Sequence, residues 1–249
     1  MKTLIILGYG KMAKALCLGL KDKYKLQICG RDSTKIKDFC TTLDSANITP
    51  LDLKNNEILL DNKEILLCIK PYALESFTYK GKAKCVYSIL NGISLDKLKQ
   101  TLKAESYARA MPNVCASVKK SITSLCGDEC IKNEALEIFK SIGECVWIAE
   151  LHFPLATALG GCSPAFLALI AESLIDSGVT YGLDRADSTK IVRALFSGFA
   201  SLLEESHPTL LKEGVMSPGG STAQGLAQLE KHALKNTILE AILASKNFA

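Results

Sequence analysis

A glycine turn near the start of the chain constrains the fold more than any other feature. The stretch "TLIILGYGKMA" places G-x-G-x-x-A directly after an apolar run and before the helical spacing of Met12, Leu16 and Leu20. In such a turn Gly8 allows the tight bend, and Gly10 lets a pyrophosphate approach the backbone. The free amides and dipole of the following helix favour a phosphate. The pattern predicts a dinucleotide-binding βαβ unit, and the alternative is a turn that merely needs small residues.

Short apolar runs and helical segments alternate as far as residue 150. Strand candidates are "KLQICGRD", "EILLCIKP", "AKCVYSILNGI", "ESYARAMPN" and "ECVWIAE". The stretch "STKIKDFCTTL" between the first two predicted strands has the spacing of a helix, with Ser33 as a candidate N-cap. This alternation predicts an α/β fold with a doubly wound, Rossmann-type parallel sheet and helices on both faces.

The pattern changes near residue 151, and no convincing strand follows. Helical periodicity covers 164–178, 184–205 and 221–246, with connections at 181–183, 206–216 and 217–220. We therefore predict a dinucleotide-binding domain at 1–150 and an all-helical domain at 151–249. The helical domain has too little core of its own, so we expect its apolar helices to need a partner subunit.

Composition and charge exclude several classes of protein. The formal net charge is +4, and the basic residues are dispersed, so we expect neither a nucleic-acid groove nor a polybasic membrane patch. The opening residues contain too short an apolar run for a secretory signal, and no stretch approaches the length of a membrane span. These features predict a cytoplasmic protein.

The ten cysteines are then expected to be reduced and to act as small core residues. Cys126 and Cys130 form one close pair, but no second close pair follows, and the three histidines are far apart. Because structural zinc sites need four clustered ligands, we predict no metal.

The end of the second predicted strand selects the cofactor. NAD sites usually place an acid there, whereas this strand ends with Gly30 and Arg31, whose guanidinium suits a phosphate. This favours NADPH, although NADH is possible because the following Asp32 could bond a ribose. The alternative for Arg31 is an ordinary solvated side chain. Lys70, at the end of a later strand, would lie beside the cofactor or be a simple strand-end lysine.

A second glycine motif, "SPGGST" at 217–222, precedes the last predicted helix. Glycines let backbone amides turn toward one point, and a helix N-terminus adds positive potential, so the motif suits a carboxylate or a phosphate. Ser221 and Thr222 add hydroxyls. The alternative is a plain N-cap with a flexible entry loop. A further small-residue cluster, "ALGGCSPAF" at 158–166, indicates either a shared concave site or close helix packing between subunits.

Taken together, these motifs resemble the pyrroline-5-carboxylate reductase family, which makes proline. The similarity covers nearly the whole chain, in the family's order. It rests on "LGYGKMAKAL", "LLCIKP", "ARAMPN", "TALGGCSPAF" and "SHPTLLKEGVMSPGGSTAQGLAQLE". It implies hydride transfer from NAD(P)H to the C=N bond of L-1-pyrroline-5-carboxylate, as the last step of proline biosynthesis. It also implies a homodimer of interlocking helices, and dimers of this family often assemble further into rings.

The resemblance carries over to individual residues. The implied cofactor-binding set is Leu7, Gly8, Tyr9, Gly10, Lys11, Met12, Arg31, Asn55, Cys68, Lys70, Pro71 and Asn91. Asn55 is matched by spacing alone, and Asn56 is equally close. The implied substrate-binding set is Glu205, Ser217, Gly219, Gly220, Ser221 and Thr222. Within it, Thr222 is the catalytic candidate, because its hydroxyl would orient the imine nitrogen.

The chain departs from the family pattern at several positions. It has Gly160, Gly161, Cys162 and Ser163 where the family commonly has S-G-S-G. Asn91 stands in a segment that usually reads S-x-A-A-G, and Gly214 replaces a frequent asparagine. These changes bear on affinity more than on the reaction.

Three rival functions remain open. A β-hydroxyacid dehydrogenase would need a catalytic lysine, for which Lys190 and Lys212 are the candidates, and neither lies in a matching glycine-rich context. A regulatory nucleotide-binding protein would not need the 217–222 motif. A reductase of a related cyclic imine, such as the six-membered homologue, would use the same carboxylate site.

Overall fold

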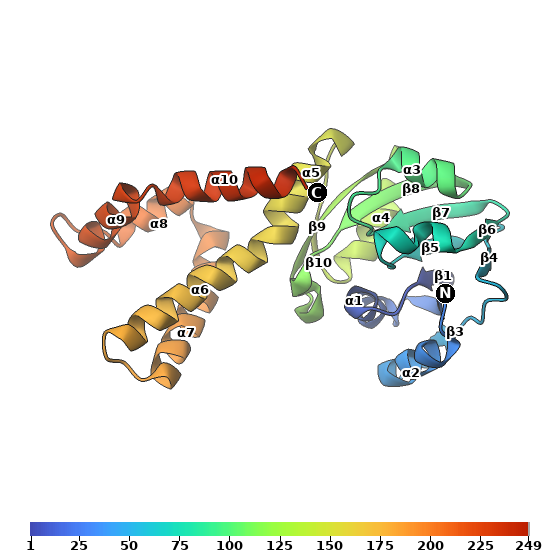
Figure 1. Cartoon of the computed structure of the whole chain (residues 1–249), viewed down its shortest axis with the longest axis horizontal. Helices are drawn as coiled ribbons and strands as arrows, with labels where there is room; N and C mark the ends of the chain where they lie inside the picture. The colour runs from blue at the N-terminus through green and yellow to red at the C-terminus, as the bar shows by residue number, and fades with distance from the viewer. Residues whose placement is uncertain (249) are drawn as a thin grey trace. The chain divides into compact units, whose positions relative to one another are not determined.

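The structure is a computed structural model that describes residues 1–248, and the chain forms two compact units (Figure 1). The first contains Met1–Cys162 and the described residues from Ser245 onward. The second contains Ser163–Ala244. The domain boundary at residue 150 stays a prediction.

An eight-stranded sheet organises the first unit, with strand order β10-β9-β8-β7-β5-β1-β2-β3. The strands are β1 (Lys2–Leu7), β2 (Tyr24–Cys29), β3 (Ile48–Pro50), β5 (Glu64–Leu67), β7 (Ala83–Ser88), β8 (Ala104–Met111), β9 (Ser121–Gly127) and β10 (Gly143–Trp147). A separate pair joins β4 (Glu57–Leu59) to β6 (Thr78–Lys80). The strand order places β1 inside the sheet, between β5 and β2, so the glycine turn leaves an interior strand.

The expectation of a parallel sheet was wrong at one edge. There β9, which the sequence analysis missed, runs antiparallel to β8, and β10 is parallel to β9, so these two strands run opposite to the others. Residues 112–120 connect β8 to β9 and contain only the short turn η2 (Val114–Val118). A parallel crossover needs about a dozen residues or more, so this connection permits an antiparallel strand instead.

Helices cover both faces of the sheet, as expected. On one face α1 (Lys11–Leu20), α2 (Ser33–Leu43) and α4 (Lys132–Lys140) pack on Leu4 and Ile6. On the other face η1 (Pro71–Ser76) and α3 (Leu95–Thr101) pack on Ile5 and Leu7. The alternation of these four β1 residues between two cores follows from the two-residue period of a strand. All four side chains are fully buried.

The N-cap of α2 differs from the expectation. Ser33 is the first helical residue, and Asp32 is the cap, whose Oδ1 accepts a hydrogen bond from the Lys35 amide at 3.0 Å. The Asp32 carboxylate also pairs with the Lys35 ammonium at 3.3 Å. An aspartate satisfies the free amides of a first turn as well as a serine does, which explains the shift by one residue.

Helices are the only regular secondary structure among the described residues of the second unit. It contains α6 (Ser163–Thr180), α7 (Arg185–Glu205), α8 (Pro208–Gly214), α9 (Ser221–Lys231) and most of α10 (Leu234–Lys246) (Figure 1). Two expectations were wrong here. The connection predicted at 206–216 contains α8, which begins with Pro208 and is capped by His207. The helix predicted at 221–246 is broken, because Ala233 adopts a left-handed φ of 53°.

This unit buries little apolar surface of its own. Ser188 and Val192 are its only buried residues among those described, although Gly178 of α6 approaches Ser188 of α7 closely. Large apolar side chains such as Leu169 and Leu239 are 61% and 67% exposed. A unit with so small a core needs a further apolar surface to cover these helices.

Helical residues run without a break from residue 150 to residue 180. The run comprises η4 (Glu150–His152), α5 (Phe153–Ala156), the π-helical turn η5 (Thr157–Cys162) and α6. By length and composition it could cross a membrane, with a mean hydropathy of 1.6 over its most apolar window. The statement that no stretch approaches a span was therefore wrong, because the segments on either side of Ser163 join into one helix.

Candidate active site

The glycine turn after β1 leaves room at the carboxyl ends of the parallel strands. The Gly8 amide donates a hydrogen bond to the Cys29 carbonyl at 2.9 Å, and Gly8 has a φ of +122°. A Cβ on Gly8 would lie 2.6 Å from the Cys68 carbonyl oxygen. A Cβ on Gly10 would meet nothing within 4 Å, and no side chain caps α1. The turn therefore presents open backbone and free first-turn amides, which suit a phosphate.

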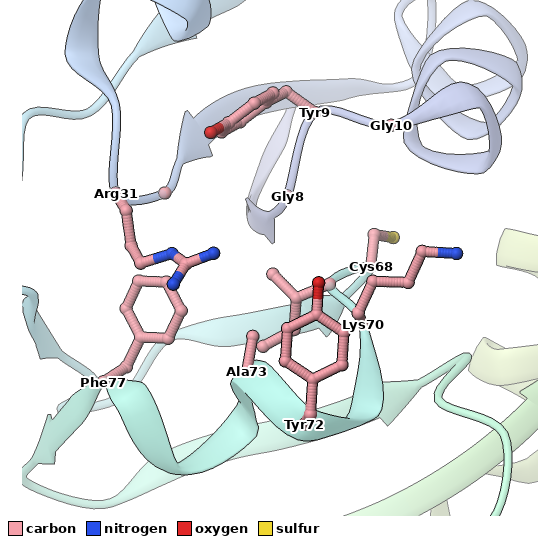
Figure 2. A pocket seen from close by; sticks show the side chains of 11 residues that line it. Gly8, Tyr9, Gly10, Arg31, Cys68, Lys70, Tyr72, Ala73 and Phe77 are labelled. Carbon is pink, nitrogen blue, oxygen red and sulfur yellow. The ribbon is translucent and has the colours of Figure 1, made fainter.

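Two adjoining cavities flank this turn. The first, of about 280 Å³, lies at the ends of β1, β2 and β5 (Figure 2). Its lining residues are Gly8, Tyr9, Gly10, Gly30, Arg31, Cys68, Ile69, Lys70, Tyr72, Ala73 and Phe77. The second, of about 530 Å³, shares four of them and continues toward β7 and β8. Its lining residues are Gly10, Lys11, Met12, Cys68, Ile69, Lys70, Pro71, Ile89, Leu90, Asn91, Met111 and Pro112.

The cavities carry positive charge. Lys11, Arg31 and Lys70 line them, and none of the described lining residues is acidic. In Figure 2 the Arg31 side chain points into the first cavity from the end of β2. The nearby Asp32 carboxylate is held by Lys35, whose amide is the main cause of the lowered pKa of that carboxyl. Arg31 therefore supplies the charge that a ligand would meet at the end of β2.

Most of the predicted cofactor residues come together here. Those that line one or both cavities are Gly8, Tyr9, Gly10, Lys11, Met12, Arg31, Cys68, Lys70, Pro71 and Asn91. Leu7 lines neither, because its side chain is fully buried in the sheet and its carbonyl accepts a hydrogen bond from the Cys68 amide. Asn55 lines neither as well, and lies in an exposed turn with a left-handed φ of 53°.

The sequence analysis missed several residues that line the cavities. They are Ile69, Tyr72, Ala73, Phe77, Ile89, Leu90, Met111 and Pro112. All follow or end a parallel strand, where ligands of such sheets bind, so strand position was the available signal. Tyr72 lies in η1, and Phe77 follows it directly.

The predicted substrate residues all lie in the second unit. Gly219 has a φ of +71°, and the Gly220 amide donates to the Ser217 carbonyl at 3.0 Å, which forms a tight turn before α9. The helix begins at Ser221, as expected, without a side-chain cap. Its first-turn amides are thus not used by a capping side chain. Thr222 is half-buried, and Glu205 ends α7 with an exposed side chain.

One cluster could hold a metal ion by composition. Ligand atoms of Glu64, Cys85 and Glu134 lie within 4.8 Å of one another. The carboxylates are already paired with ammonium groups, since Lys84 lies 3.1 Å from Glu64 and Lys2 pairs with Glu134. These lysines supply the positive charge that a metal would bring. The expected absence of a metal remains a prediction.

Comparison with known proteins accounts for both units. Residues 150–249 match a family model described as pyrroline-5-carboxylate reductase dimerisation, and residues 3–92 match one described as NADP oxidoreductase, coenzyme F420-dependent. The chain is 35% identical to the pyrroline-5-carboxylate reductase of Helicobacter pylori, over 97% of this chain and 96% of that protein. It belongs to the pyrroline-5-carboxylate reductase family.

Other proteins to which the chain is similar are reductases of the same kind. The enzyme of Synechocystis is 31% identical over 96% of this chain and 94% of its own length. The solved pyrroline-5-carboxylate reductase of Streptococcus pyogenes superposes with a TM-score of 0.85 at 29% identity, over 98% of this chain and 96% of that one. That of Plasmodium falciparum, solved with NADP bound, gives 0.78 at 26% identity, over 99% and 96%.

These findings confirm the expected family, fold class and reaction. The chain is an oxidoreductase that acts on a C=N bond, uses NAD(P)H and takes a small-molecule substrate. Oligomerisation is confirmed at the level of the family's dimerisation region, which includes the long helical run from residue 150. A role in dimerisation also explains why so few of the described residues of the second unit are buried.

Proposed function

We propose that this protein reduces L-1-pyrroline-5-carboxylate to L-proline with NADPH in the cytoplasm. The observation that carries the proposal is the pair of adjoining cavities at the glycine turn, lined by three cations and by no described acid, in a chain that matches the reductases end to end. When bound, NADPH supplies the hydride that reduces the C=N bond.

The residues of the turn fit a dinucleotide. The open backbone at Gly10 and the first amides of α1 would hold the pyrophosphate, because Gly10 is unobstructed. Gly8 would serve the turn itself, because a side chain there would meet the Cys68 carbonyl. Arg31 would pair with the 2′-phosphate that distinguishes NADPH. The engagement of Asp32 with Lys35 supports this assignment, because the Asp32 carboxylate, which could otherwise bond a ribose, is already engaged.

The assignment of the substrate site rests on the second glycine motif. We propose that the amides between Ser217 and Thr222 bind the substrate carboxylate and that Thr222 orients the imine nitrogen. The positive φ of Gly219 and the uncapped start of α9 support an anion site there. Glu205 is the proposed acidic neighbour of the substrate. A hydroxyl barely ionises near neutrality, so Thr222 orients rather than acts as the main acid.

We also propose a homodimer that assembles into a ring of dimers. The exposed leucines of α6, α7 and α10 support a large apolar interface. Sedimentation velocity at micromolar concentration tests this assembly. We expect a species no smaller than a dimer, and a monomer would contradict the proposal.

The test of the proposed function is a direct assay. Purified protein is mixed with racemic pyrroline-5-carboxylate and NADPH, and the loss of the reduced-nicotinamide absorbance is followed, with NADH in parallel. We expect rapid oxidation that requires the imine and is faster with NADPH. No oxidation by folded protein with either cofactor would refute the proposal.

A related cyclic imine is the second candidate. Asn91 lines the larger cavity, and the departures at Gly160 and Cys162 lie in a motif that the family usually fills with serines. The same assay therefore also measures reduction of the six-membered homologue, in parallel with the five-membered imine. A higher kcat/KM for the larger ring would favour this alternative.

A further inference from the structure

A buried side chain between β8 and β9 forms a hydrogen bond to the π-helical turn η5. The Asn113 Nδ2 donates a hydrogen bond to the Gly160 carbonyl at 2.9 Å, and Asn113 is 7% exposed. A π-turn is a rare conformation that occurs frequently at functional sites. Neither Asn113 nor the Gly160 carbonyl belongs to the proposed cofactor-binding or substrate-binding residues.

Asn113 is held in a single orientation by its other bonds. The side-chain Oδ1 accepts a hydrogen bond from the Cys115 backbone amide at 3.1 Å. The backbone amide of Asn113 donates a hydrogen bond to the Ser121 Oγ at 3.0 Å. Ser121 is 1% exposed and starts β9. The Gly160 carbonyl, an acceptor, faces the side-chain nitrogen of Asn113, and the Cys115 amide, a donor, faces the side-chain oxygen. The side-chain amide therefore cannot flip without losing both hydrogen bonds.

The residues before Asn113 form a wall of the larger cavity. Met111 and Pro112 line it together with Met12 and Asn91. The π-turn packs against this wall, since a Cβ on Gly161 would lie 3.7 Å from the Met111 Cγ. Asn113 thus ties the wall of the cavity to the turn that packs against it.

The two cavities hold different ends of the proposed dinucleotide. Arg31, at the proposed 2′-phosphate, lines only the smaller cavity, while Gly10, at the proposed pyrophosphate, lines both. The larger cavity lies beyond the pyrophosphate and is therefore the nicotinamide end. It is this end whose wall Asn113 holds.

We propose that Asn113 is a positioning residue that fixes the Met111–Pro112 wall at the nicotinamide end by clamping it to η5. This inference rests on the proposed use of NADPH. Loss of the clamp loosens the contact with nicotinamide and leaves the adenosine end unchanged.

The test compares two ligands on three variants by isothermal titration calorimetry. The ligands are NADP⁺, which spans both cavities, and adenosine 2′,5′-bisphosphate, which fills only the adenosine end. Asn113→Asp keeps the acceptor for the Cys115 amide but turns a carboxylate oxygen toward the Gly160 carbonyl, and Asn113→Ala removes both contacts. Asn47→Ala is the matched control, because Asn47 Nδ2 makes an equivalent 2.9 Å bond to the Lys21 carbonyl away from the cavities.

We expect both Asn113 variants to bind NADP⁺ about 10-fold more weakly, since each loses the hydrogen bond to the Gly160 carbonyl, and to bind the bisphosphate unchanged. Asn47→Ala should bind both ligands as the wild type does. Wild-type NADP⁺ affinity in Asn113→Asp, an equal loss for both ligands, or the same loss in Asn47→Ala would overturn the proposal. Failure of the proposed function would instead appear in the unmodified protein, as absent NADP⁺ binding or absent imine reduction.

Discussion

Gly8 and Cys68 approach so closely that only a glycine fits between β1 and β5. A Cβ on Gly8 would lie 2.6 Å from the Cys68 carbonyl oxygen, and Gly8 has a φ of +122° that other residues rarely adopt. Gly10, two residues later, has a φ of −86° and open space where its side chain would be. The two glycines of one motif therefore serve different purposes, one in the fold and the other in binding.

Alanine at these two positions should separate folding from binding. Gly8→Ala should lower the free energy of unfolding by about 1–3 kcal/mol, because it forces a strained φ and a backbone clash. Gly10→Ala should unfold like the wild type but weaken NADPH binding by more than about 10-fold, since its methyl group occupies the path of the pyrophosphate. Urea unfolding and NADPH fluorescence titration measure these effects. Wild-type NADPH affinity in Gly10→Ala would contradict the assignment.

Arg31→Ala should change the choice of cofactor. Loss of a charge-assisted hydrogen bond to the 2′-phosphate should raise the KM for NADPH by about 10- to 100-fold and leave that for NADH nearly unchanged. Steady-state kinetics with both cofactors measures the ratio. Lys37→Ala is the control, because Lys37 is an exposed cation of α2 that lines neither cavity. An equal effect of both variants would mean that Arg31 contributes only to the general positive field.

Thr222→Ala should slow turnover without changing cofactor affinity. The lost hydroxyl would cost roughly 1 kcal/mol, or about 5- to 10-fold in kcat, if it orients the imine nitrogen. Thr222→Ser keeps the hydroxyl and should retain most of the activity. Stopped-flow turnover and NADPH titration make the comparison. A large loss of NADPH affinity in Thr222→Ala would remove Thr222 from the substrate site.

Alkylation of the cysteines should follow burial and pKa. Burial raises the pKa of Cys17 and Cys29 to about 12, so both remain thiols, and hence poor nucleophiles, at pH 8. Cys130 is exposed and should react first with iodoacetamide. Peptide mass spectrometry after brief labelling measures the order. Simultaneous labelling of all three, or a disulfide at any of them, would contradict a reduced, buried role for the core thiols.

Local signals in the sequence were enough to predict the central βαβ unit. Glycine spacing and apolar periodicity identified β1, α1 and the turn between them, because each is set by residues close together in the chain. Placement of Cys68 and Lys70 beside that turn followed from the rule that parallel strands end at one edge. The same rule could have indicated Met111 and Pro112.

Other features depend on contacts that a single sequence does not display. The antiparallel β9 follows from the short connection after β8, and the N-cap of α2 shifted to Asp32 because two adjacent residues could each serve. The bond from Asn113 to Gly160 joins residues 47 positions apart and has no local signature. Asn55 was assigned by spacing alone, and it lies in an exposed turn that lines neither cavity.

The most direct test of the central claim follows the hydride itself. The protein is incubated with pyrroline-5-carboxylate and NADPH that carries deuterium on the transferable position of nicotinamide C4, and the product is examined by NMR and mass spectrometry. We predict L-proline with one deuterium on C5. Unlabelled proline, deuterium released to water, or no proline at all would contradict direct hydride transfer to the imine carbon.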